Sequence, residues 1–393
     1  MRETSVSAGK RGRRRRHTLL GAFAAAGALT GALLAAPGAA AQQSPITEYG
    51  PVPSSLPVGG VCEVEFDHND NLWVEQYLSS QIARYDTTTG TFTNFDTPMP
   101  LSMPGGMDLD ADGNLWMPQV TGNSLLRVDT RDGSMTEIPL PWANAFATTV
   151  LGIPLHTGLG LANDIAWGPD HALWFTLGGL NSVGRYDPHT GEFTKYRVPG
   201  EILGQVHALF GIIKPGPGRT VLFGLPQMNQ VGTIDVDTKH FTLYTMPTPA
   251  SFPVGVRSAS DGSIWVGEAL GLKIARIDPA TGHITEYPLA GPAGILTGIL
   301  DGLIGHSVGN PLPSPGPVAE GSDGNIYIAV SFPAAVGLGN QIARFDPRTG
   351  DVTMWPTPSS ASYPCDINPH QPGAIWFGLL TPNRIGRLDI NAT

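Results

Sequence analysis

A chain of 393 residues is long enough for two or three ordinary domains or for one large repeat architecture. Its 50 glycines and 36 prolines disfavour long helices, while 41% of hydrophobic residues still allows a large core. A formal net charge of −10 offers no electrostatic basis for binding nucleic acid or an anionic membrane, so both are disfavoured as partners. The composition predicts many short strands joined by tight turns.

Residues 1–41 have the organisation of an export signal. A basic cluster at residues 11–16 precedes an apolar run at 19–36, and three alanines at 39–41 offer a cleavage site. Because that site directly follows the apolar run, we predict a signal peptide rather than a membrane span, and no other stretch is apolar enough to cross a bilayer. The arginines favour the twin-arginine (Tat) route, with the general (Sec) route as the alternative. We therefore predict a secreted, extracytoplasmic protein whose remaining residues, 42–393, form a single domain with a net charge of −16.

Residues 42–393 contain seven copies of one repeat, each with an aromatic residue, most often tryptophan, at a fixed position. In chain order these positions are Trp73, Trp116, Trp174, Phe223, Trp265, Tyr327 and Trp376. Successive spacings of 43, 58, 49, 42, 62 and 49 residues match propeller blades, the longer ones with insertions. Each copy splits into four short runs separated by turns; in the fifth copy these runs are 255–258, 264–267, 273–278 and 283–287. The repeat predicts an all-β fold, a seven-bladed β-propeller of four-stranded blades.

Two features predict that the ring closes between its first and last blades. The run 46–49 copies the outer strand at 284–287, and the last repeat has no outer strand of its own, so the N-terminal strand should complete blade 7. Cys62 and Cys365 each lie eleven residues before their tryptophan, in equivalent places of blades 1 and 7. In an exported protein they are predicted to form a disulfide across the seam, and two free buried thiols are the alternative.

The repeat resembles that of the virginiamycin B lyases (streptogramin lyases). Matching stretches include 168–176, Gly-Pro-Asp-His-Ala-Leu-Trp-Phe-Thr, and 383–388, Asn-Arg-Ile-Gly-Arg-Leu, and the resemblance covers nearly all of residues 42–393. It implies elimination at the ester of a cyclic depsipeptide antibiotic, with a histidine base and a magnesium ion held by acidic residues near the central axis. The family's histidines tend to follow the proline that begins the innermost strand. None of the corresponding positions here is histidine: they are Cys62, Gly105, Asn163, Phe210, Val254, Gly316 and Cys365.

The predicted functional site is the axial mouth, the face on which the innermost strands begin. The resemblance carries over Glu268 as a metal ligand, three residues past the tryptophan of blade 5, and a solvated acid at the rim is the alternative; blades 1 and 2 carry Gln76 and Gln119 there. The starts of the innermost strands supply further polar groups near the axis: Glu63, Asp108, Asn163, Asp164 and Asp366. Their oxygens suit a hard cation, Mg²⁺ or Ca²⁺, so we predict a divalent metal site; hydrogen bonding to backbone or water is the alternative.

Three histidines lie in segments between blades, namely His156, His207 and His306. Histidine is the natural general base near neutral pH, and His207 is the favoured candidate because it directly precedes an innermost strand. The alternative for each of them is an ordinary surface histidine.

Three insertions on the face of the mouth, 142–157, 290–313 and 332–340, are rich in apolar residues. They predict a lid over an apolar pocket, a docking surface for a protein partner, or a satellite core. Within the second, residues 305–309 around Ser307 fit the G-x-S-x-G esterase pattern, but in a loop rather than the strand-to-helix elbow that this motif needs. The leading prediction is an enzyme that opens an apolar ester or lactone at the axial mouth by metal-assisted elimination. The alternatives are a non-catalytic propeller that binds a ligand or protein, and a lactonase or esterase.

Overall fold

The computed structural model describes residues 44–142, 147–150, 153–156, 160–200, 211–290, 314–330, 340–360 and 362–393. For 147–150 and 153–156 it describes the backbone only. Ser44–Thr393 form one compact unit. The predicted signal peptide, His207, His306 and Ser307 lie outside the described residues, and so does the side chain of His156.

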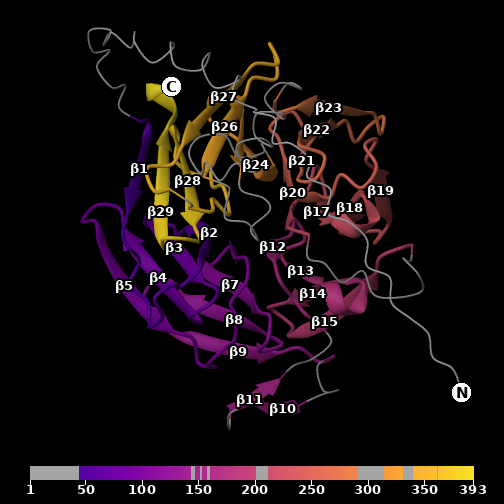
Figure 1. The fold of residues 1–393 in the computed structure, drawn as a ribbon. Helices are drawn as coiled ribbons and strands as arrows, with labels where there is room; N and C mark the ends of the chain where they lie inside the picture. The colour runs from indigo at the N-terminus through magenta and orange to yellow at the C-terminus, as the bar shows by residue number, and fades with distance from the viewer. Residues whose placement is uncertain are drawn as a thin grey trace, which may run out of the picture. The chain divides into compact units, whose positions relative to one another are not determined.

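Antiparallel sheets are arranged as blades around a central axis (Figure 1). Blade 1 consists of β2 (Val61–Phe66), β3 (Asn71–Gln76), β4 (Gln81–Asp86) and β5 (Thr91–Asp96). Blade 2 consists of β6 (Asp108–Leu109), β7 (Asn114–Gln119), β8 (Ser124–Asp129) and β9 (Met135–Pro139). Blade 3 consists of β12 (Ile165–Trp167), β13 (Leu173–Leu177), β14 (Ser182–Asp187) and β15 (Glu192–Arg197). Blade 4 consists of β16 (Ile213–Pro215), β17 (Thr220–Leu225), β18 (Gln230–Asp235) and β19 (Phe241–Thr245). Blade 5 consists of β20 (Pro253–Ser258), β21 (Ile264–Glu268), β22 (Lys273–Ile277) and β23 (Ile284–Pro288). Blade 6 consists of β24 (Pro315–Glu320), β25 (Ile326–Val330), β26 (Gln341–Phe345) and β27 (Val352–Pro356). The predicted seven-bladed all-β propeller is confirmed.

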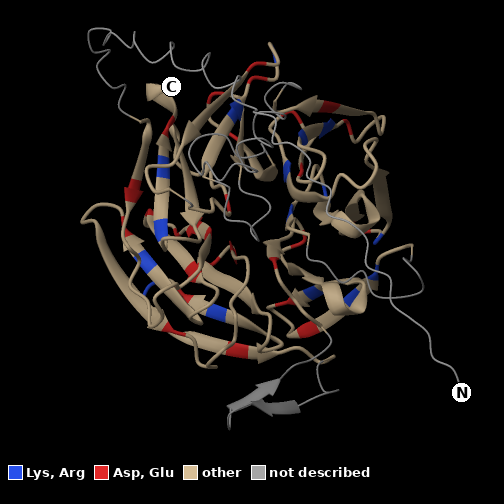
Figure 2. Cartoon of the chain, in the orientation of Figure 1, with Lys and Arg blue, Asp and Glu red and all other residues tan. Residues whose placement is uncertain are grey.

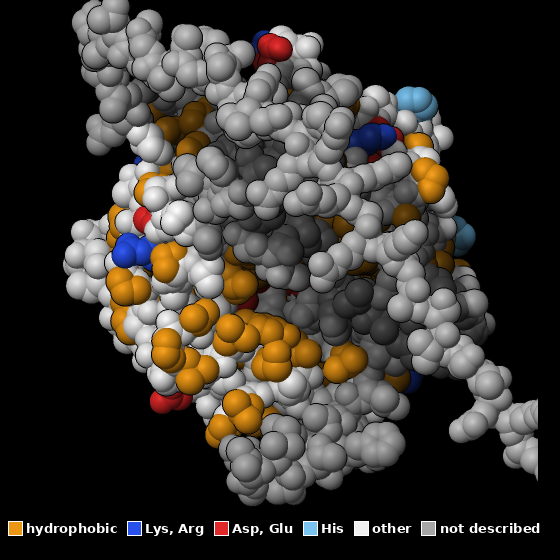
Figure 3. Space-filling model, in the orientation of Figure 1, with side chains coloured by type: hydrophobic (Ala, Val, Ile, Leu, Met, Phe, Trp, Pro, Cys, Tyr) orange, Lys and Arg blue, Asp and Glu red, His pale blue; other side chains and the backbone are white. Residues whose placement is uncertain are grey.

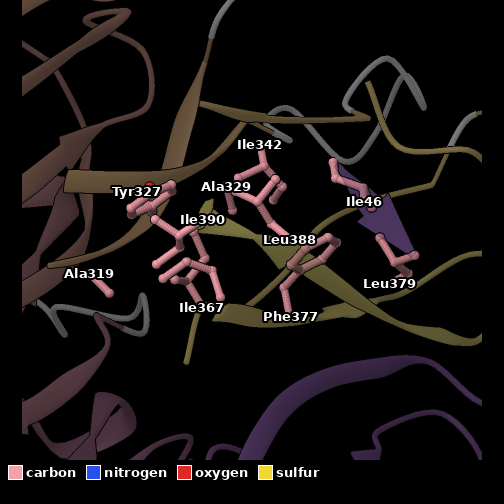
Figure 4. Close-up of a cluster of buried hydrophobic side chains, with 11 residues drawn as sticks. Ile46, Ala319, Tyr327, Ala329, Ile342, Ile367, Phe377, Leu379, Leu388 and Ile390 are labelled. Carbon is pink, nitrogen blue, oxygen red and sulfur yellow. The ribbon is translucent and has the colours of Figure 1, made fainter. Parts of the chain in front are cut away.

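Blade 7 closes the ring in the predicted manner. It consists of β28 (Ala374–Leu379), β29 (Arg384–Asp389) and the N-terminal strand β1 (Ile46–Tyr49), which pairs antiparallel with β29. Its innermost position is reduced to isolated bridges, Pro364 with Leu379 and Asn368 with Trp376. Ile46 packs into the hydrophobic cluster of blades 6 and 7, beside Leu388 and Phe377 (Figure 4). The predicted disulfide between Cys62 and Cys365 is present and joins residues 303 apart in sequence across this seam.

Little of the described chain departs from this pattern. A two-stranded hairpin, β10 (Ala147–Val150) and β11 (Ile153–His156), lies within the first insertion. Helical structure in the described ranges is limited to short 3₁₀ turns, η1 (Gly178–Leu180), η2 (Pro226–Met228) and η4 (Ile390–Ala392). Among these residues no helix has the length and hydrophobicity needed to cross a membrane.

The turn before the second strand explains the repeated Asp and Trp. In blade 2 the Asp110 carboxylate accepts hydrogen bonds from the backbone N–H of Asn114 at 2.8 Å and from the indole Nε1 of Trp116 at 2.8 Å. In blade 1 the Asp67 carboxylate accepts the indole N–H of Trp73 at 2.9 Å. Both tryptophans are almost fully buried, and a buried indole N–H needs such a partner. The motif therefore serves the blade core and not the site.

The strand register corrects one assignment from the sequence. In blade 3, Trp174 pairs with Arg185 of β14 and the next residue, Phe175, pairs with Gly184. In blade 4, Phe223 pairs with Gly232 of β18, so Phe223 corresponds to Phe175. The position equivalent to tryptophan is therefore Leu222. The sequence-based assignment of Phe223 to this position is wrong because it follows the aromatic residue. Correcting it shifts the repeat position of every residue in the innermost strand of blade 4 by one.

Candidate functional site

Acidic and basic residues occur along the inner part of the ring (Figure 2). The carboxylates of Glu63 and Glu65 interact electrostatically with charged groups from several other blades, so these side chains lie near one another at the axis. Counted from the tryptophan position, they occupy two levels two residues apart, which puts both levels on the same face of each strand. The level nearer the mouth, ten residues before the tryptophan, is called the upper ring and contains Glu63, Asp164 and Asp366. The level eight residues before it is called the lower ring and contains four charged side chains and one amide: Glu65, Asp108, Lys214, Arg257 and Asn368.

Lys214 reaches from the lower ring into the upper ring. Its ammonium Nζ lies 3.3 Å from Glu63 Oε2 and 3.7 Å from Asp164 Oδ1. All three side chains are buried, with residue exposures of 6%, 8% and 2% for Lys214, Glu63 and Asp164. Burial opposes the charge on the lysine, but the carboxylates of Asp164, Glu63 and Asp366 outweigh it and raise the pKa of Lys214. The axis therefore carries a lysine ammonium beside buried acids.

Backbone groups of neighbouring blades fix the aspartates. Asp164 accepts hydrogen bonds from the N–H of Ile165 at 2.8 Å and from the N–H of Ile213 in blade 4 at 2.7 Å. In the lower ring, Asp108 of blade 2 accepts the N–H of Trp167 in blade 3 at 2.7 Å. Each of these aspartates thus joins its own blade to the next, which preorganises the rings.

Glu63 is less tightly held than Asp164 and has a strongly altered proton affinity. Burial, followed by the carboxylate of Asp366, raises the pKa of Glu63 well above its usual value, although Lys214 works in the opposite direction. In the lower ring, burial and the nearby Asp108 raise the pKa of Glu65 to about 8. Behind them, burial raises the pKa of Glu75, which accepts the N–H of Cys62 at 2.9 Å. Acids with raised proton affinity are typical of sites that transfer protons.

The structure brings together three of the predicted metal ligands and separates the other two. Glu63, Asp164 and Asp366 share the upper ring, while Asn163 lies one residue closer to the mouth and its backbone carbonyl accepts the N–H of Gly106 at 2.9 Å. Glu268 is the last residue of β21, the second strand of blade 5, and it pairs with Pro253 of the innermost strand and with Lys273 of the third strand.

Glu268 is fully buried rather than solvated. Burial, followed by the neighbouring carboxylate of Glu286, raises the pKa of Glu268 to about 7. Glu286 itself is paired with Lys273, whose Nζ lies 2.7 Å from its Oε2. The alternative in which Glu268 is a solvated acid at the rim is therefore wrong for this structure.

Neither the upper ring nor the pair of Glu268 and Glu286 is arranged to hold a divalent ion. In the described part of the chain, no three His, Cys, Asp or Glu side chains are placed to hold a metal ion. A lysine ammonium occupies each group instead, Lys214 among the upper-ring acids and Lys273 beside Glu286. Each acidic group is therefore neutralised by a lysine and not arranged around a metal ion.

Large exposed hydrophobic side chains occur at the mouth. On the face shown in Figure 3, hydrophobic side chains gather beside a central hollow. The large hydrophobic residues that are exposed in the described chain all belong to segments between blades or to turns between second and third strands, which open on the mouth. We call them the apolar rim: Leu56, Val58, Leu78, Leu101 and Leu270.

Reasoning from the sequence missed Lys214, Glu65 and Arg257. The available signal was the period of two: a charged residue eight places before the tryptophan in blades 1, 2 and 5. Lys214 fits that series only when Leu222, and not Phe223, is taken as the reference. Assignment of Phe223 to the tryptophan position therefore removes Lys214, the cation of the site, from the series.

Comparisons with known proteins agree with the repeat. A model of the virginiamycin B lyase family matches residues 154–306. Crystal structures of virginiamycin B lyase from Staphylococcus aureus, one of the selenomethionine protein and one of a catalytically inactive variant with quinupristin, superpose with a TM-score of 0.68 at 22% identity, covering 88% of this chain and 98% of theirs.

The fold is shared more widely. The extracellular domain of a putative hybrid two-component system from B. thetaiotaomicron superposes with a TM-score of 0.60 at 13% identity, covering 87% of this chain and 39% of that one. No curated protein matches the sequence. The resemblance predicted from the repeats is confirmed: the chain has the propeller fold of the virginiamycin B lyases, and residues 154–306 match that family in sequence.

Proposed function

We propose that the protein opens the ring of an apolar ester or lactone at the axial mouth by elimination. The observation that carries the proposal is the pairing of Lys214 with Glu63 and Asp164 at the mouth side of the axis, at 3.3 and 3.7 Å. The match to the lyase family and the apolar rim support it. The rim offers contact to an apolar substrate, and the upper ring offers a base beside a cation.

Elimination needs two groups that the upper ring supplies. It breaks a C–H bond and the alkyl C–O bond of the ester, forms a C=C bond and releases a carboxylate, so the ring opens without a change in mass. Glu63 is proposed to take the proton, because a carboxylate of raised proton affinity is a stronger base. The ammonium of Lys214 is proposed to stabilise the negative charge that develops on oxygen.

The histidines remain candidate bases alongside Glu63. His207, His306 and His156 come from segments between blades that enter the mouth face in the sequence-based assignment, with His207 the favoured one. Their separate replacement by alanine is therefore part of the test.

We also propose that the protein is exported. The disulfide between Cys62 and Cys365 is compatible with an oxidising compartment, and residues 1–41 have the pattern of a signal peptide. Detection of a mature chain that begins at Gln42 in the culture medium or periplasm tests this proposal; a full-length chain retained in the cytosol would contradict it.

A second candidate is a propeller that binds an apolar ligand or protein without catalysis. It is favoured by the absence of histidine where the family's histidines tend to lie, and by the neutralisation of the upper ring by Lys214. Propellers of similar fold occur as extracellular domains of other proteins, so the fold alone does not select the enzyme.

The deciding experiment incubates the protein with quinupristin, other type B streptogramins and simpler lactones, with mass spectrometry as the readout. An opened product of unchanged mass supports elimination, and Glu63→Gln should then reduce its rate by about 100-fold or more. A product heavier by one water indicates hydrolysis and directs attention to Ser307. If no substrate reacts but a ligand of the panel binds, the binding propeller replaces the enzyme.

A further inference from the structure

The upper ring has the composition of a site for a hard cation, but a side chain of the protein occupies it. Carboxylates of Glu63, Asp164 and Asp366 are the oxygen ligands that Mg²⁺ and Ca²⁺ prefer. Lys214 sends its ammonium among them from the neighbouring level, within 3.7 Å of two of the three. A buried ammonium is costly unless such partners surround it.

We propose that Lys214 is the built-in cation of the axial site, that it takes the place of a divalent metal among Glu63, Asp164 and Asp366, and that the site therefore works without metal. This deepens the proposed function, since it names the group that stabilises charge there. Its test is metal binding, so it can fail or succeed independently of ring opening.

The local structure brings acids from separate blades to this cation. Glu63 comes from blade 1 and Asp164 from blade 3, and they approach each other across Gly106 of blade 2. A Cβ atom at Gly106 would lie 1.9 Å from Asp164 Oδ1 and 3.2 Å from Glu63 Oε1, so only glycine leaves room for the two carboxylates. The close approach of two acids is stable only with a positive charge beside them, and Lys214 supplies it.

The geometry also disfavours a metal while the lysine is present. Both oxygens of Asp164 already accept backbone N–H groups, from Ile165 and Ile213. A divalent ion would have to displace an ammonium that three buried carboxylates hold in its charged form. Removal of that ammonium leaves the carboxylates buried and uncompensated, which favours the capture of a hard divalent ion.

The test compares wild-type protein with Lys214→Met in titrations with Mn²⁺, followed by calorimetry and by electron paramagnetic resonance. We expect no stoichiometric binding by the wild type. Lys214→Met should bind one Mn²⁺ with an affinity about 100-fold or more above the wild type, because a neutral side chain replaces a positive charge beside the acids. Mn²⁺, Mg²⁺ or Ca²⁺ should also raise the melting temperature of this variant.

Two matched variants separate the effect of position from that of charge. Lys214→Arg keeps the cation and should bind no Mn²⁺. Lys273→Met removes a lysine that also pairs with a glutamate, but away from the axis, and should gain no metal site. Should Lys214→Met be unfolded without metal, folding on addition of Mn²⁺ would support the proposal.

Three results would overturn it. The first is a divalent ion that binds the wild type stoichiometrically and is lost in Glu63→Gln. The second is a folded Lys214→Met that binds no Mn²⁺. The third is a Lys214→Met protein that stays unfolded whether or not Mn²⁺ is present.

Discussion

Gln119 of blade 2 and Glu268 of blade 5 occupy the same position in their repeats, each opposite a glutamate of the outer strand. The Gln119 amide donates a hydrogen bond from Nε2 to Oε1 of Glu137 at 2.6 Å. Glu268 faces Glu286 in the corresponding place, and a carboxyl can make the same donation only when it carries a proton. Burial, followed by that neighbour, raises the pKa of Glu268 to about 7, so Glu268 binds a proton more strongly than an ordinary glutamate.

The first prediction concerns the pH dependence of stability at this position. The pKa of Glu268 is about 7 in the folded protein and near its ordinary 4.5 in the unfolded chain, so the folded state binds more protons between these values. The stabilisation of the folded state by protonated Glu268 is fully present below pH 4.5 and is lost as pH rises through 7. Relative to Glu268→Gln, the wild type should lose on the order of 3 kcal/mol of unfolding free energy between pH 5 and 8. Urea unfolding at a series of pH values measures the difference.

The matched control for this prediction is Gln119→Glu. This substitution places a second carboxyl beside Glu137 and should introduce a similar loss of stability as pH rises. The wild-type Gln119 amide does not titrate, so it causes no such loss. Parallel pH profiles of the wild type and Glu268→Gln would contradict the raised pKa of Glu268.

A second prediction concerns the disulfide at the seam. Cys62 and Cys365 tie blade 1 to blade 7 across 303 residues of sequence. Replacing both with serine should lower the free energy of unfolding by about 2–5 kcal/mol, because the unfolded chain regains the entropy that the cross-link removes. Reduction of the wild type should lower its melting temperature to that of the double variant, and equal melting temperatures for oxidised and reduced wild type would disprove a role in closure.

The closing strand itself gives a third prediction. Ile46 is 4% exposed and packs with Leu388 and Phe377 in blade 7. Ile46→Ala should cost about 2–5 kcal/mol through lost burial and the cavity left behind. Thr47→Ala, at the exposed neighbouring position of the same strand, should change stability by less than about 0.5 kcal/mol. Equal effects of the two substitutions in urea unfolding would show that β1 does not close the ring by packing.

The fold could be predicted because its determinants recur seven times. In blades 1, 2 and 3 an aspartate accepts the tryptophan N–H, and in blades 6 and 7 Asp323 and Gln371 accept from Tyr327 and Trp376, so an error in one copy leaves the others intact. The copied strand at residues 46–49 and the paired cysteines fixed how the ring closes. These are local signals whose meaning does not depend on the rest of the structure.

The site could be predicted only in part, because it depends on register. Glu63, Asp164 and Asp366 share a level in three blades that were aligned correctly. The sequence does not reveal Lys214 when Phe223 is assigned to the tryptophan position, because a shift of one residue turns a side chain to the other face of a strand. The resemblance predicts Glu268 as a metal ligand, but its environment depends on Glu286 and Lys273, which lie on other strands.

The last prediction tests the apolar rim as the surface that receives the substrate. Leu78 of blade 1 and Leu270 of blade 5 are 44% and 57% exposed, so their replacement by serine should leave stability nearly unchanged. If an apolar ester binds across the mouth, each substitution should raise KM by about 10-fold through lost apolar contact, with kcat little affected. Ala280→Ser, at an exposed turn on the opposite face, is the control and should change neither constant. Should Leu78→Ser and Leu270→Ser behave like this control in steady-state kinetics, the substrate does not use the rim, and it would have to enter the upper ring through polar contacts alone.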